Sequence, residues 1–116
     1  MQTDTDFIRA ADATLARIGE AVDQAVADSD VDLDWSLNDG ILEIECEDGS
    51  KLIVNRHVIN RELWVAARAG GFHFRAVGGR WEDTRSREDL GTVLARLLHD
   101  QAALTVVLPP LTAPAS

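Results

Sequence analysis

Residues 31–46 read VDLDWSLNDGILEIEC, and this stretch decides the architecture. Apolar and polar residues alternate on both sides of Asn38-Asp39-Gly40, with the period of two that is typical of strands with one buried face. Asn, Asp and Gly tolerate positive φ and therefore favour a tight turn. The pattern predicts an antiparallel hairpin whose aliphatic side chains and Cys46 point inward while its carboxylates point to solvent.

The strand pattern continues after this hairpin. We expect further strands at 51–55, 63–67 and 72–77 and a short strand around Trp81, separated by turns that contain glycine. Consecutive strands joined by tight turns pair antiparallel, which predicts an antiparallel sheet. Trp81 and Trp35 are predicted to lie in the core.

Two amphipathic segments flank the strands. Between Phe7 and Val26 apolar residues recur every three or four positions, which indicates one buried helix face. A second helix is predicted to begin after the N-cap Ser86, with Asp89 as part of a capping box. An antiparallel sheet with one wet face needs both helices on its other face. The predicted fold is therefore α+β: a two-layer sandwich in which about six antiparallel strands carry the N- and C-terminal helices on one face.

Length and composition limit the class of protein. At 116 residues we expect one domain, which we assign to residues 1–108, and a C-terminal tail at 109–116. No apolar run approaches the ~20 residues of a membrane span, and the N-terminus lacks the pattern of a signal peptide, so we expect a cytoplasmic bacterial protein without a membrane partner. The single cysteine excludes an internal disulfide, and the sequence pI of 4.6 argues against nucleic acid as a partner.

The acidic residues are concentrated in one part of the chain. Between Ile18 and Ser50 there are eleven Asp and Glu residues and no Lys or Arg, whereas residues 51–116 hold six acids and nine bases. Such crowding costs stability through repulsion, and a one-signed patch usually faces a cation or a basic partner. Carboxylates are hard oxygen ligands that suit Mg, Ca, Mn or iron and do not by themselves choose among these metals.

Three stretches closely resemble the frataxin family in its bacterial form: residues 38–44 (NDGILEI), residues 48–56 (DGSKLIVNR) and residues 63–81, from Leu-Trp-Val-Ala through Gly-Gly-Phe-His-Phe to Trp. The resemblance implies a frataxin-like fold and an iron-binding protein that regulates iron–sulfur cluster assembly. It further implies docking on a cysteine desulfurase of the IscS type, with the iron–sulfur scaffold as a further partner. We expect iron, as Fe²⁺ or Fe³⁺, to be bound weakly by a monomer.

The resemblance also implies the positions of the sites. The implied metal ligands lie along what we call the acidic ridge: Glu20, Asp23, Asp28, Asp30, Asp32 and Asp34. The implied partner contacts are Asn55, Trp64, Glu20, Asp23, Asp32, Glu43 and Glu45. An exposed Trp is typical of interface hot spots. His73 alternates outward and is a candidate for an additional metal ligand.

Several positions depart from the family pattern. Gly19, Gln24 and Ala27 occupy ridge positions where relatives can place further acids, which predicts a reduced metal capacity for the first helix. His57 and Ile59 stand where the family commonly has Gln and Pro, which predicts an altered connection between the third and fourth strands.

Two other functions stay open at this point. One is a ferroxidase or iron-storage protein that oxidises Fe²⁺ at the carboxylate sites, and the other is a metal-independent acidic adaptor. No nucleophile has a histidine partner that is evident from the sequence, and no phosphate-binding glycine loop precedes a helix, so we expect a protein that is not an enzyme.

Overall fold

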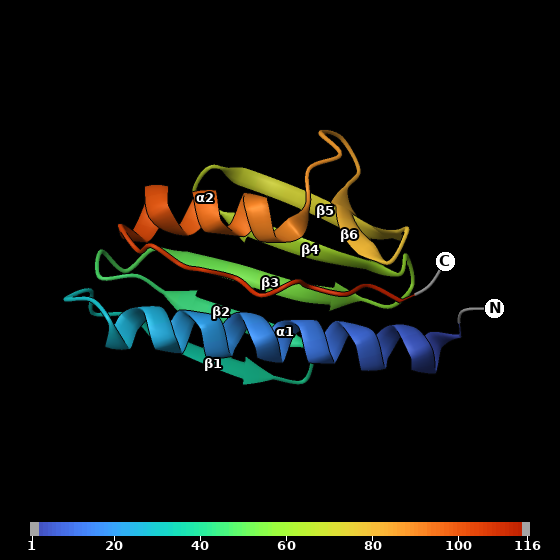
Figure 1. The fold of residues 1–116 in the computed structure, drawn as a ribbon, viewed down its shortest axis with the longest axis horizontal. Coiled ribbons are helices and arrows are strands. Elements are labelled where there is room, and N and C mark those ends of the chain that lie inside the picture. The colour runs from blue at the N-terminus through green and yellow to red at the C-terminus, as the bar shows by residue number, and fades with distance from the viewer. Residues whose placement is uncertain (1–2, 115–116) are drawn as a thin grey trace.

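The computed structural model describes residues 3–114 and forms a two-layer sandwich of one sheet and two helices (Figure 1). The strands are β1 (Asp34–Asn38), β2 (Ile41–Glu45), β3 (Lys51–His57), β4 (Glu62–Ala67), β5 (Gly70–Val77) and β6 (Arg80–Asp83). They pair antiparallel in chain order, so strands that are consecutive in the sequence lie side by side in the sheet. The predicted α+β class and the predicted antiparallel sheet are both confirmed.

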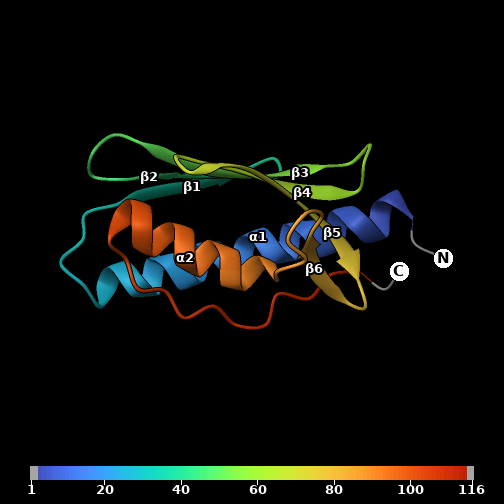
Figure 2. The same cartoon turned by 90° about the horizontal axis from the view of Figure 1, so that it is seen from above.

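The two helices cover the same face of the sheet and leave the other face open (Figure 2). Helix α1 (Asp4–Ala27) begins with a capping box, because Thr3 Oγ1 accepts from the Asp6 N–H and the Asp6 carboxylate accepts from the Thr3 N–H. Helix α2 (Leu90–Ala102) follows the last strand. Neither of these helices is apolar enough over a sufficient length to span a membrane.

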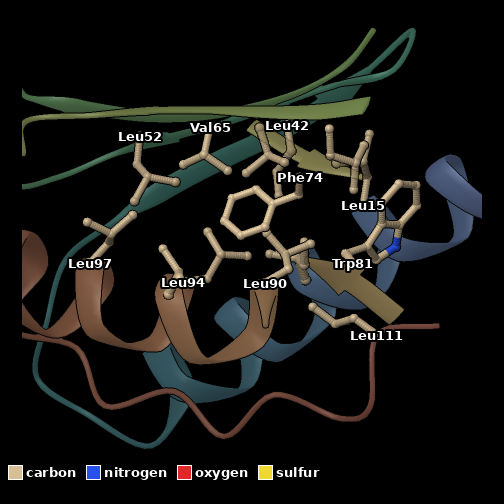
Figure 3. Packing of buried hydrophobic residues seen from close by; sticks show 14 of the residues in the cluster. Leu15, Leu42, Leu52, Val65, Phe74, Trp81, Leu90, Leu94, Leu97 and Leu111 are labelled. Carbon is tan, nitrogen blue, oxygen red and sulfur yellow. The ribbon is translucent and has the colours of Figure 1, made fainter. Parts of the chain in front are cut away.

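The hydrophobic core fills the space between the two layers (Figure 3). Leu52 and Val65 of the sheet point toward Leu94 and Leu97 of α2, and Phe74 lies among them. Fully burying one such side chain contributes about 1.5–3 kcal/mol. Cys46 is also buried and is a free thiol, which confirms its predicted role as a small apolar core residue.

A threonine inside the core joins three separate segments of the chain. Trp81 is fully buried, as predicted, and its Nε1–H donates to Thr14 Oγ1 of α1 at 3.0 Å. The Thr14 hydroxyl in turn donates to the Thr112 carbonyl at 3.4 Å. The segment after α2 runs between the two helices, on their far side from the sheet (Figures 1 and 2), and its buried residues are Leu104, Val106, Leu111 and Ala113. Core residues therefore lie on both sides of the domain boundary that we placed at 108.

The predicted first hairpin and its turn are confirmed. Asn38 pairs with Ile41 across a two-residue turn, in which Asp39 has φ 49° and Gly40 has φ 77°. Both central residues have positive φ, which is the requirement of the tight turns that suit the twist of a hairpin. The first strand is shorter than predicted: it begins at Asp34 and not at Val31, because β2 ends at Glu45 and offers no further backbone partner.

The start of the second helix also differs from the prediction. The N-cap is Asp89, whose carboxylate accepts from the Gly91 N–H at 3.1 Å, and not Ser86. The buried Asp83 carboxylate accepts from the N–H groups of the two residues Arg85 and Ser86, and this arrangement holds residues 84–88 in a turn. A short loop therefore precedes α2.

Gly19 is a packing position and does not belong to the surface of the acidic ridge. It is buried in α1, and a Cβ built on it would lie 2.7 Å from Cζ3 of Trp35. Trp35 is only partly buried, so its prediction as a core residue was too strong. Its Nε1–H donates to Asp23 Oδ1 at 3.3 Å. The glycine therefore lets β1 approach α1 closely at the point where the ridge begins.

We predict that Gly19→Ala destabilises the fold by about 1–3 kcal/mol, because the added methyl group overpacks the contact with the Trp35 ring. Urea unfolding of the variant measures the loss. In a Trp35→Phe background the smaller ring leaves room for the methyl group, and the cost of Gly19→Ala should largely disappear. An equal cost in both backgrounds would show that the ring contact is not the cause.

Candidate functional site

The acidic ridge is built from three consecutive pieces of the chain. Glu20 and Asp23 lie on the last turns of α1, Asp28 is its C-cap, and Asp34 begins β1. Asp30 and Asp32 lie in the connection between α1 and β1, so Asp32 is not part of the strand that the sequence pattern predicts from Val31. All six carboxylates are exposed. The last turn of α1 carries no basic residue, so the negative end of the helix dipole adds to the charge of the ridge.

Some ridge carboxylates have hydrogen-bond partners, and others have none. Asp23 accepts from Trp35, and Asp28 accepts from the Gln24 amide at 3.1 Å. Within residues 3–114 the Asp30 and Asp32 carboxylates accept no hydrogen bond and form no ion pair. The backbone N–H of Asp32 donates to Glu47 Oε1 at 2.6 Å, which joins the ridge to the turn that follows β2.

Within residues 3–114, bases from outside the acidic stretch pair with three of its acids, Asp39, Glu43 and Asp48, and with none of the six ridge carboxylates. Lys51 Nζ lies 3.6 Å from Glu43 Oε2, and Arg68 Nη1 lies 3.0 Å from Asp48 Oδ2. The Ser50 hydroxyl and backbone N–H also donate to Asp48, and these bonds hold the pKa of that carboxyl below its usual range. Glu43, a predicted partner contact, is therefore paired within the molecule, while the ridge keeps its charge.

The ridge does not form a ready-made metal centre. Over the part of the chain that the structure describes, no three His, Cys, Asp or Glu side chains are arranged as a set of metal ligands. Carboxylates of the ridge would have to move together to share a cation, since metal–oxygen distances are about 2.0–2.6 Å. The arrangement suits water-rich, low-affinity binding of a hard cation.

The open face of the sheet carries a second group of predicted site residues. Asn55 lies directly opposite Trp64 across β3 and β4, and Trp64 lies directly opposite His73 across β4 and β5. Ile41, which is 44% exposed, pairs with Asn55 on the other side. The sheet thus aligns Trp64, Asn55 and an exposed aliphatic side chain in one row on the open face.

Trp64 is the middle ring of an aromatic stack that the sequence did not predict. His57 stacks on one face of the indole, with ring centroids 3.8 Å apart and planes 8° apart, and His73 stacks on the other face at 4.5 Å and 9°. The indole Nε1–H donates to Glu62 Oε1 at 2.8 Å. His57 Nδ1 is buried with no hydrogen-bond partner within residues 3–114, so ring contact orients this imidazole. The pairing of β3 with β4 could have indicated the stack, because His57 lies two residues beyond Asn55, the residue directly opposite Trp64, and on the same face of the sheet.

Comparisons with known proteins agree with this geometry. Residues 1–104 match the family model described as the frataxin-like domain. The chain belongs to the frataxin family. It is similar to proteins named iron-sulfur cluster assembly protein CyaY from Ralstonia nicotianae and from Dechloromonas aromatica. The Ralstonia protein is 45% identical and aligns over 91% of this chain and 94% of its own length, and the Dechloromonas protein is 50% identical over 90% and 97%.

Solved structures of the frataxin family share the architecture. The frataxin from Psychromonas ingrahamii superposes with a TM-score of 0.81 at 30% identity, over 90% of this chain and 96% of that one. Yeast frataxin superposes with a TM-score of 0.69 at 21% identity, over 84% of this chain and 80% of that one, and at this identity it supports the fold alone.

We predict that replacing Asp28, Asp30, Asp32 and Asp34 together by Asn raises the unfolding free energy by about 1 kcal/mol at low ionic strength. The reason is that the substitutions remove like-charge repulsion and an unfavourable contact with the helix dipole. Urea unfolding measures the change, which should shrink as salt screens the charges. A marked loss of stability would instead identify these acids as structural.

We also predict that His57→Ala leaves the fold intact but uncovers one face of the Trp64 ring. Loss of the ring contact should cost about 0.5–1.5 kcal/mol. Acrylamide quenching in a Trp35→Phe background reports on Trp64, because the remaining Trp81 is fully buried. Quenching should increase in His57→Ala and stay unchanged in the control His99→Ala, which removes an exposed histidine on α2. Equal quenching in both variants would show that the stack does not cover Trp64.

Proposed function

We propose that this protein acts in iron–sulfur cluster assembly as a non-enzymatic, iron-binding regulator that docks on a cysteine desulfurase of the IscS type. Membership of the frataxin family supports the pathway, since relatives that are 45% and 50% identical carry the name of iron–sulfur cluster assembly proteins. The observation that carries the docking proposal is the acidic ridge itself. A row of exposed carboxylates with no base among them favours a partner with a basic surface.

The charge of the ridge should act mainly on the rate and specificity of docking. Opposite fields steer two proteins together, and the effect falls as salt shortens the Debye length to about 8 Å at physiological ionic strength. A complementary basic groove on the desulfurase would meet the end of α1 and the start of β1. The low net contribution of each exposed ion pair, about 0–1 kcal/mol, requires that many of them act together.

The open face of the sheet would supply the rest of the interface. Trp64 and Asn55 lie beside the exposed Ile41, so this row offers an apolar contact together with an amide that can donate and accept hydrogen bonds. Tryptophan is among the residues that contribute most to binding energy at protein interfaces. Because the sheet is continuous, this row and Asp34 at the start of β1 can contact one partner assembly in the cytoplasm.

We propose that the ridge holds iron weakly, either as cargo or as a signal. Hard carboxylate oxygens bind Fe²⁺ and Fe³⁺, and the absence of a converging ligand set within residues 3–114 agrees with weak binding. His73 is an additional candidate ligand, although its Nδ1 lies 3.8 Å from Glu62 and its ring stacks on Trp64. A metal-independent adaptor would use the same ridge without iron.

We predict that Asp30→Asn with Asp32→Asn weakens binding to a purified IscS-type cysteine desulfurase about tenfold at low salt, through loss of steering and of rim ion pairs. These two carboxylates have no partners within residues 3–114, so the substitutions should leave the fold unchanged. The control is Asp4→Asn with Asp100→Asn, which removes the same charge from exposed acids outside the ridge. Biolayer interferometry across a salt series measures both variants.

Adding Fe²⁺ to the same measurement separates the alternatives. If regulation depends on iron, Fe²⁺ should change the affinity of the wild type for the desulfurase and should change that of the ridge variant less. If the protein is a metal-independent adaptor, Fe²⁺ should change neither affinity. Consumption of oxygen on adding Fe²⁺ that the ridge variant lacks would favour a ferroxidase. Equal desulfurase affinity of the ridge variant and the wild type at low salt would refute docking through the ridge.

A further inference from the structure

Four exposed arginines gather at the edge of the sheet formed by β5, β6 and the loop that follows them. We call this set the basic corner: Arg75, Arg80, Arg85 and Arg87. Figure 1 shows β6 and the orange loop after it in the right half of the molecule, and the connection between α1 and β1 at the left end. The basic corner therefore lies away from the acidic ridge on the 44 Å long axis of the molecule.

Hydrogen bonds and strand pairing bring the basic corner together. Arg75 is the register partner of Glu82, and Glu82 accepts from Arg80 Nη2 at 3.1 Å. The same Arg80 nitrogen donates to the Arg87 carbonyl at 3.1 Å. The Thr84 N–H donates to the backbone of β5 at 2.9 Å, which holds the loop against the sheet.

Two acids of this region, Glu82 and Asp83, are recessed beneath the bases, and a third, Glu88, is 37% exposed but paired with Arg96. The Glu82 side chain is 13% exposed while its partner Arg80 is 50% exposed. Asp83 is 5% exposed and its carboxylate is used by the N–H groups of the loop. Glu88 is held by two bonds from Arg96, at 2.9 and 3.0 Å. What reaches solvent at this corner is therefore mostly guanidinium.

Three of the four guanidinium groups have no hydrogen-bond or ion-pair partner within residues 3–114. Arg75, Arg85 and Arg87 form no ion pair with any residue in the range 3–114. Arg85 also lines a recess of about 200 Å³ between β5 and the loop, together with Phe72, His73 and two acids, Asp83 and Glu88, whose carboxylates already accept hydrogen bonds from the loop and from Arg96. Planar guanidinium groups bind carboxylates through two parallel hydrogen bonds, which are stronger than those between neutral groups. The corner thus offers several free bidentate donors beside a recess that can take a side chain.

We propose that the basic corner binds an acidic segment of a partner protein, and that it forms a second interface whose charge is opposite to that of the acidic ridge. This inference goes beyond the proposed function, because it uses none of the residues assigned to iron or to the desulfurase except the neighbouring His73. The molecule would then have two oppositely charged binding surfaces. It could bind one protein with a basic surface and another with an acidic segment at the same time.

The charge distribution favours a short acidic peptide segment over a long polyanion. The whole chain carries a net charge of −9, so a nucleic acid or an anionic membrane that extends beyond the corner meets a repulsive field. A few carboxylates on a flexible segment occupy only the corner itself. Carboxylates also match the fork geometry of arginine one to one.

The test titrates the full-length ¹⁵N-labelled protein with a synthetic peptide of alternating Glu and Gly at low ionic strength, followed by NMR. We expect shift changes to be concentrated at Arg75 and at residues 80–87. Arg75→Gln with Arg85→Gln should weaken peptide binding about tenfold or more, because it removes two charge-assisted donors. The matched control is Arg9→Gln with Arg17→Gln, which removes two exposed arginines from α1 and should change binding less than about twofold.

Each outcome decides for or against the basic corner. No shift changes at these residues, or an equal loss in both arginine variants, would overturn it, as would tighter binding of a short oligothymidylate of equal charge. If the double variant does not melt like the wild type, Arg87→Asn replaces it, since Asn tolerates the positive φ of 66° at this position. The variant of Asp30 and Asp32 should bind the peptide at least as well as the wild type, so failure here is distinguishable from failure of desulfurase docking.

Discussion

Only one face of the sheet can be covered by the two helices of this chain, and the rest of the structure depends on that constraint. Side chains alternate along each strand, so every residue next to a buried aliphatic one must face water or a partner. The covered face takes Leu42, Val54 and Phe74. The same alternation then sends Asn55 and Trp64 to the open face, whatever their individual preference. The position of Trp64 on the open face is therefore a consequence of the register, and with a histidine stacked on each of its faces the ring is only partly exposed, not fully exposed as predicted.

The position of the acidic ridge follows from the close approach of β1 to α1. Gly19 and the Trp35 ring bring the end of the helix against the edge strand, and the Trp35 N–H donates to Asp23. Carboxylates from the helix and the strand are thereby collected along one edge. Within residues 3–114, bases of β3 and of the loop after β4 pair with Asp39, Glu43 and Asp48, and none of them reaches the six ridge carboxylates. The repulsion that remains costs stability, and a binding function gives a physical reason for keeping it.

Much of the fold could be predicted from the sequence, because its signals are local. The turn at Asp39 and Gly40 and the inward position of Cys46 follow from φ preference and alternation. The start of α2 was predicted wrongly at Ser86, because the buried Asp83 carboxylate captures the N–H groups that a helix would have used. The role of Gly19 was missed for a related reason. Its neighbour Trp35 lies sixteen positions away in the sequence, and a pattern of charges cannot show a contact of that kind.

Two of the five positions that depart from the family pattern, Gly19 and His57, belong to contacts within this chain. Gly19 does not carry an acid because a side chain there would collide with Trp35, and His57 stands where it can stack on Trp64. In both cases the exchanged residue contacts a tryptophan beside a proposed binding surface. A change of packing therefore explains these two exchanges better than a change in the number of metal ligands does. It follows that the number of acids in the helix is a poor measure of what the ridge can bind, since the geometry between α1 and β1 decides which carboxylates can act together.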